Sequence, residues 1–113
     1  MRAILIDWLI EVHQKFRLRS ETLFVTVNLI DRYASKQHIA KSELQLVGVS
    51  CMLVASKYEE IYPPVLRDFV QICNKSFSAP QILGMEQKVL FALDFDVKSH
   101  SPLRFLERYA KHA

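Results

Sequence analysis

The stretch LVGVSCMLVAS, residues 46–56, decides the fold class. It is apolar or small at nearly every position, so a helix built from it is apolar on all sides. Such a helix has to be surrounded by other helices, because it has no polar face to turn toward water. Gly48, Ser50, Ala55 and Ser56 are small, which allows neighbouring helices to approach closely. The stretch therefore predicts a buried central helix.

The flanking sequence predicts the helices that surround it. Apolar residues recur at helical spacing on both sides, and Pro63 and Pro64 end the central helix. Ser20 is expected to cap the second helix, and Ser78 with Gln81 forms a capping box before the fifth. An orthogonal bundle of five helices follows, then an irregular segment and the start of a sixth helix at Ser101-Pro102. The predicted helices cover residues 1–17, 21–35, 42–60, 65–73 and 78–93.

Composition excludes several other classes of protein. The 113 residues are 50% hydrophobic and 24% charged, with only two glycines, which argues against disorder and against an all-β fold with many tight turns. The net charge of +3 is spread along the chain instead of forming a basic stripe, so no nucleic-acid partner is expected. Residues 46–55 are too few to span a membrane. Cys51 and Cys73 lie in apolar surroundings and are predicted to be buried free thiols.

The residues that catalysis or metal binding would need are also not gathered in the sequence. The four histidines are scattered without metal-ligand spacing, and no nucleophile elbow or Gly-rich phosphate loop is present. Glu59 and Glu60 are adjacent on a helix and point apart, so they do not form an acid–base pair. The chain is predicted to be a binding module with no catalytic residues, no metal and no cofactor.

Five stretches of the sequence resemble the cyclin box, and in particular the N-terminal box of mitotic cyclins of the A and B types, with a lean toward B. The similarity covers essentially the whole chain. These stretches are residues 1–12 (MRAILIDWLIEV), 44–48 (LQLVG), 55–64 (ASKYEEIYPP), 85–86 (ME) and 93–96 (LDFD).

The resemblance implies a five-helix cyclin box over residues 1–98, with residues 99–113 as a linker and a truncated first helix of a second box. It implies a regulatory subunit that binds and activates a cyclin-dependent protein kinase and recruits substrates in mitotic control, in the nucleus and cytoplasm. An N-terminal helix and a second box are expected to be missing from the chain, which suggests a fragment.

A kinase-binding site is implied around Lys57 and Glu86, which match the lysine and glutamate that hold the kinase's mobile regulatory helix. Apolar contacts would come from Val54, Tyr58, Leu90 and Phe95. Spacing alone favours the simpler interpretation, in which Lys57 and Glu86 pair with each other or with solvent.

A substrate-docking groove for Arg-x-Leu peptides is implied at the first helix. Met1, Ile4, Leu5 and Trp8 share one helical face, while Ala3, Ile6, Leu9 and Ile10 offer a second apolar face for the core. An apolar slot accepts leucine and a carboxylate pairs with arginine. The alternative is that both faces are simply buried. By resemblance the groove residues are Met1, Ile4, Leu5, Trp8, Glu11, Leu44 and Gln45.

Two further charges, Arg2 and Asp31, resemble positions that brace the family's helices. Arg2 lies among apolar neighbours and needs a partner if it is buried, and Asp31 is the candidate. The competing function is a cyclin-box domain of a general transcription factor or pocket-type protein that binds DNA or peptides. A purely structural scaffold is the third alternative.

Overall fold

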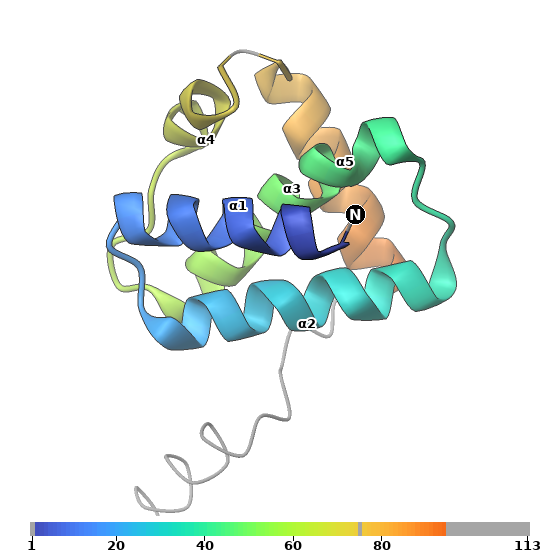
Figure 1. Cartoon of the computed structure of the whole chain (residues 1–113), viewed down its shortest axis with the longest axis horizontal. Coiled ribbons are helices and arrows are strands. Elements are labelled where there is room, and N and C mark those ends of the chain that lie inside the picture. The colour runs from blue at the N-terminus through green and yellow to red at the C-terminus, as the bar shows by residue number, and fades with distance from the viewer. Residues whose placement is uncertain (1, 75, 95–113) are drawn as a thin grey trace, which may run out of the picture.

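The structure is a computed structural model, and it describes residues 2–74 and 76–94, with the side chains of Arg2 and Ala3 excepted. Five α-helices and one short 3₁₀ helix make up this part of the chain (Figure 1). No strand occurs in residues 2–74 and 76–94, so the predicted all-α class is confirmed. The helices are α1 (Arg2–Lys15), α2 (Ser20–Lys36), η1 (Lys41–Glu43), α3 (Leu44–Glu59), α4 (Leu66–Ile72) and α5 (Ala79–Ala92). The predicted sixth helix lies outside the described residues.

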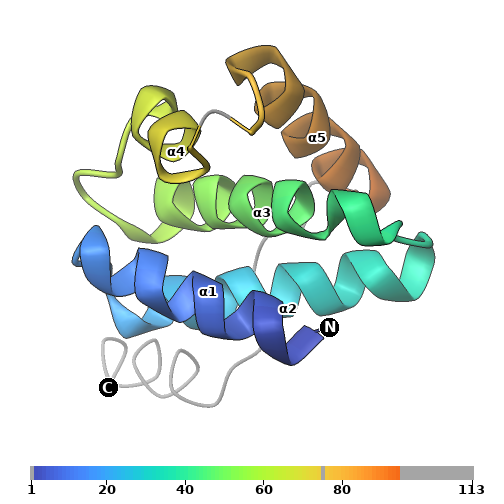
Figure 2. The same cartoon turned by 45° about the horizontal axis from the view of Figure 1, so that its top comes forward.

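Helix α3 is the central element of the bundle. It packs mainly against α2 and α5 and also contacts α1 and α4, as the two views in Figures 1 and 2 show. Every residue from 47 to 56 is buried, which confirms the prediction of a helix that is apolar on all sides. Ser50 is tolerated there because its hydroxyl donates to the Ile82 carbonyl of α5 at 3.2 Å. Cys51 and Cys73 are buried free thiols, as predicted, and burial raises the pKa of both.

Gly48 brings α1 close to α3. A Cβ atom at this position would lie 2.9 Å from Cδ1 of Leu5, which is shorter than an ordinary contact between carbon atoms. Leu5, Leu9 and Val12 of α1 are buried against the core. Of the predicted core face, Ala3, Ile6, Leu9 and Ile10, Leu9 is confirmed. Ile6 and Ile10 are only partly buried, and the side chain of Ala3 lies outside the described part of the chain.

The start of α2 differs from the prediction. Arg19, not Ser20, occupies the N-cap position, and its side chain makes no capping hydrogen bond. Instead, Glu60 reaches across from the end of α3: its Oε2 accepts from the Arg19 backbone N–H at 2.7 Å and from the Thr22 hydroxyl. A carboxylate at a helix N-terminus is favourable, so a residue 41 positions away replaces the local cap. The α3–α4 connection is thereby tied to α2.

The start of α5 confirms the predicted capping box. Ser78 is the N-cap, its Oγ accepts from the Gln81 N–H at 3.4 Å, and Gln81 Oε1 accepts from the Ser78 N–H at 2.8 Å. Pro80 lies in the first turn, where its missing N–H costs nothing. The third helix was predicted to begin at residue 42. In the structure this first turn is the 3₁₀ helix η1, and α3 itself begins at Leu44. Within the described ranges, no helix is both long and apolar enough to cross a bilayer.

Candidate functional site

The predicted kinase-facing residues come from the C-terminal part of α3 and the middle of α5. Val54, Lys57 and Tyr58 lie on α3, and Glu86 and Leu90 lie on α5. All five line one shallow cavity of about 320 Å³. The spacing explains this: residues 54, 57 and 58 share one face of α3, and residues 86 and 90 share one face of α5. Phe95, the sixth predicted contact, lies outside the described residues.

Lys57 and Glu86 meet in this cavity. The Lys57 Nζ donates to Glu86 Oε2 at 2.9 Å. The two side chains differ in exposure: that of Lys57 is 54% exposed and that of Glu86 only 11%. The two side chains therefore lie side by side, with Lys57 open to solvent and Glu86 mostly buried. The pairing that the sequence left open is present, at the surface and within reach of a partner.

The apolar residues beside this pair extend the surface. Val54 is buried and Leu90 is partly buried, whereas Tyr58 is 38% exposed. In the α3–α4 connection, the neighbouring residues Ile61 and Tyr62 are 84% and 92% exposed. Large apolar side chains next to one another at the surface commonly mark a site of protein association. Ile61 and Tyr62 belong to the stretch 55–64 that resembles the cyclin box, but no contact with a partner was predicted for either; two consecutive apolar residues after the end of a helix were the available signal.

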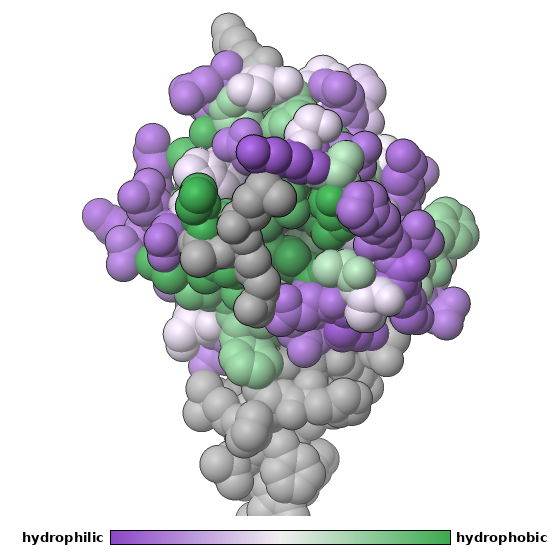
Figure 3. Space-filling model, turned by 45° about the vertical axis from the view of Figure 1, so that its right-hand side comes forward, coloured by the Kyte–Doolittle hydropathy of each residue, from purple (hydrophilic) through white to green (hydrophobic). Residues whose placement is uncertain are grey.

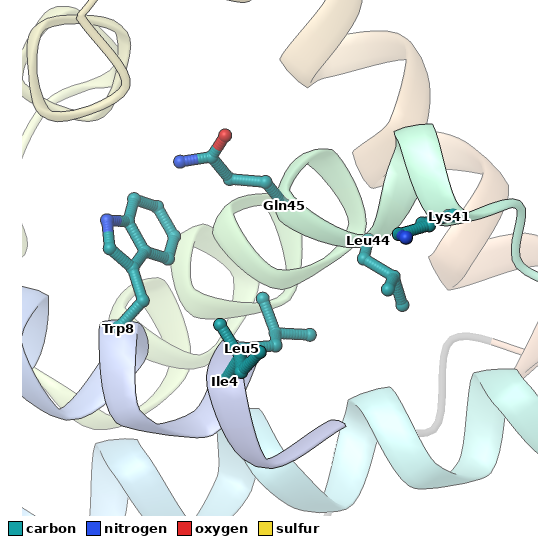
Figure 4. A pocket seen from close by; sticks show the side chains of 6 residues that line it. All are labelled: Ile4, Leu5, Trp8, Lys41, Leu44 and Gln45. Carbon is teal, nitrogen blue, oxygen red and sulfur yellow. The ribbon is translucent and has the colours of Figure 1, made fainter. Parts of the chain in front are cut away.

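The predicted docking groove lies between the first half of α1 and the start of α3 (Figure 4). Its volume is about 350 Å³. Figure 3 shows that apolar side chains gather on the face where α1 and α3 begin, with hydrophilic side chains around them. Ile4 is 74% exposed, so the alternative in which both faces of α1 are buried is wrong at this residue. The lining residues are Ile4, Leu5, Trp8, Lys41, Leu44 and Gln45.

Three details of the groove differ from the prediction. Leu5 is only 6% exposed, so it belongs to the core as well as to the groove floor. Glu11 is exposed on α1 but does not line the cavity. Lys41 of η1 lines it and was missed, because an exposed lysine before a helix carries no sequence signal for binding. Met1 lies outside the described residues.

The proposed bracing charges are only partly placed. Asp31 is exposed on α2, and the side chain of Arg2 lies outside the described part of the chain. Their pairing therefore stays a prediction. Among the described residues, no group of three or more histidine, cysteine, aspartate or glutamate side chains could hold a metal ion.

Comparisons with known proteins identify the family and the fold. Residues 1–98 match the N-terminal domain family of cyclins. The whole chain is 51% identical to Cyclin-B2-1 of Oryza sativa subsp. japonica and covers 27% of its length. It is 50% identical to the G2/mitotic-specific cyclin S13-7 of Glycine max and covers 44% of that protein.

A solved structure has the same fold. The X-ray structure of a viral cyclin from herpesvirus saimiri superposes with a TM-score of 0.86 at 25% identity, over 97% of this chain and 48% of that one. The chain thus spans less than half the length of each relative named here. The sequence match, the five-helix bundle and the solved structure all agree: the chain belongs to the cyclin family and contains the cyclin N-terminal domain.

Proposed function

We propose that this chain activates a cyclin-dependent protein kinase, as a regulatory part that catalyses no reaction itself. The observation that carries the proposal is the Lys57–Glu86 pair, in a cavity with three of the four apolar residues expected to contact the kinase. Its mitotic relatives support the same role.

The pair has hydrogen-bonding capacity left over for a partner. An ammonium group has three donors and a carboxylate about four acceptor positions, and the pair uses one of each. The ends of a helix expose backbone N–H and carbonyl groups without partners inside the helix. At one end of the kinase helix, Lys57 can therefore donate to a backbone carbonyl, or Glu86 accept from a backbone N–H, of that end or of the segment that flanks it. Val54, Tyr58 and Leu90 supply the apolar wall against which that helix would pack.

Activation then follows as a population shift. A kinase is active only when its regulatory helix brings a glutamate to the phosphate-binding lysine. A cyclin surface that fits the helix only in this inward position shifts the helix toward that position. The size of the shift is set by the difference between the affinities of the cyclin for the inward and the outward positions. To move the helix from 1% to 99% inward, that difference has to reach about 5.5 kcal/mol. Charged hydrogen bonds at a fixed spacing are suited to such discrimination.

A pull-down distinguishes this function from the DNA-binding alternative. The immobilised chain is incubated with a cyclin-dependent kinase or with duplex DNA at physiological salt. We expect capture of the kinase and not of the DNA, because positive and negative charges are mixed along the sequence. Capture of DNA alone would overturn the proposal.

We further propose that the groove between α1 and α3 docks Arg-x-Leu segments of substrates or inhibitors. Trp8 forms one end of this groove, and an aromatic residue in an apolar pocket typically dominates peptide binding (Figure 4). We expect Trp8→Ala to weaken binding of an Arg-x-Leu peptide about 30-fold or more, measured by fluorescence anisotropy.

Tyr62→Ala is the matched control, because Tyr62 is an aromatic residue, 92% exposed, outside the groove. The Tyr62→Ala variant is expected to bind the peptide with the same affinity as the unchanged chain. Equal loss in both variants, or no loss in Trp8→Ala, would contradict a docking role for the groove.

A further inference from the structure

The groove between α1 and α3 has a lysine at one end, and a glutamate follows on α1 beyond its other end. Trp8 and Lys41 lie at opposite ends, with Ile4, Leu5 and Leu44 between them (Figure 4). Glu11 follows Trp8 by three residues on α1, about 4.5 Å further along the helix axis. A carboxylate thus lies beyond the Trp8 end and an ammonium group at the other end.

We propose that Lys41 selects docking peptides that carry an acidic residue on the C-terminal side of the leucine. The inference rests on the proposed docking function of the groove, and it adds a second charge requirement. If the arginine of an Arg-x-Leu segment is directed toward Glu11, the leucine enters the apolar middle and the following residues run toward Lys41. An aspartate or glutamate there meets an ammonium group, and a lysine or arginine is repelled by it.

The chain around Lys41 leaves its ammonium group available for this role. Lys41 is exposed and begins η1, so its side chain is held at one end of the groove by a short, ordered turn. Glu43, its nearest acidic neighbour in the sequence, lines a different cavity between α2 and α5. Among the lining residues whose side chains the structure describes, Lys41 is the one that carries a charge. The electrostatic preference at this end is therefore for an anion.

The expected effect is modest because the pair is solvent-exposed. An exposed ion pair changes affinity about two- to fivefold, and salt weakens it. The acidic residue is placed at each of the four positions after the leucine, which together reach up to about 14 Å in an extended peptide. At the best position we expect about threefold tighter binding than with serine and still weaker binding with lysine.

Charge reversal at Lys41 supplies the decisive test. The fluorescent peptides are titrated with the unchanged chain, with Lys41→Glu, and with Lys88→Glu, which makes the same change of charge on α5 outside the groove. Lys41→Glu should still fold, since a carboxylate suits the start of a helical segment. We expect this variant to prefer the lysine peptide, and Lys88→Glu to keep the original preference.

The possible results separate the two proposals. If none of the peptides binds, the docking function itself fails. If all of them bind with the same affinity, and Lys41→Glu changes nothing, the groove stands and the role of Lys41 is overturned. A preference for acidic peptides that Lys41→Glu and Lys88→Glu abolish equally would point to net charge instead of this residue, and it would also overturn the inference.

Discussion

Kinase activation is expected to fall about a hundredfold or more when Lys57 and Glu86 are both replaced by alanine. Each residue would lose charged hydrogen bonds to the kinase, and truncating such a group at an interface costs about 2–5 kcal/mol. Removing both residues together leaves neither charge without its partner. The fold is expected to change little in stability, because the Lys57 side chain is 54% exposed and a partly exposed pair contributes about 1 kcal/mol or less.

A charge swap, Lys57→Glu with Glu86→Lys, tests whether the pair acts on the kinase or only on the cyclin fold. The swapped residues can still attract each other across the 2.9 Å contact between α3 and α5. They would, however, present an acceptor where the kinase helix needs a donor, and a donor where it needs an acceptor. We therefore expect the swap to be as inactive as the double alanine variant.

The measurement is phosphorylation of a peptide by a cyclin-dependent kinase at increasing concentrations of each cyclin variant, with thermal melting of the cyclin alone as the control. Full activation by the swapped variant would show that the pair is merely structural. The single variant Lys57→Ala is less informative, because it leaves the carboxylate of Glu86, only 11% exposed, without its partner. An unpaired buried polar group costs about 1–3 kcal/mol, so lost activity could come from lost stability.

Most of the fold was predictable because the central helix has an unambiguous pattern. Residues 46–56 have no polar face, and the structure buries all but the first of them. The capping box at Ser78 was also predictable, because both of its partners lie within four residues. The cap of α2 was not predictable: Glu60 reaches Arg19 only once α2 and α3 have packed together. Local capping preferences favoured Ser20 as the N-cap, but a tertiary hydrogen bond from Arg19 N–H to Glu60 satisfies the start of α2 instead.

The candidate sites were predictable to different degrees. Helical spacing alone places Val54 with Lys57 and Tyr58, and Glu86 with Leu90, but it cannot bring the two groups together. Their association came from the family resemblance, and the packing of α3 against α5 agrees with it. The contribution of Lys41 to the groove could not be predicted in this way, because it depends on how η1 approaches α1.

Phe69→Ala is expected to give the largest loss of stability. Phe69 is fully buried on α4, a helix of seven residues that is too short to be stable alone. Its ring packs edge-to-face on Phe16, with the ring centroids 5.3 Å apart, and so attaches α4 to the segment that follows α1. Truncating a buried phenylalanine costs about 3–5 kcal/mol. For a domain of this size we expect the melting temperature to fall by about 12 °C or more.

Phe24→Ala is the matched control, because it makes the same substitution on another helix, α2, at a side chain that is 47% exposed. Its effect is expected to stay within about 0.5 kcal/mol, as for most surface substitutions. The comparison is informative because the substitution is the same in both variants and the two rings differ in how far they are buried. Urea unfolding followed by circular dichroism measures both variants. Equal midpoints would mean that Phe69 does not hold α4 on the bundle, and the core described here would then be wrong at that helix.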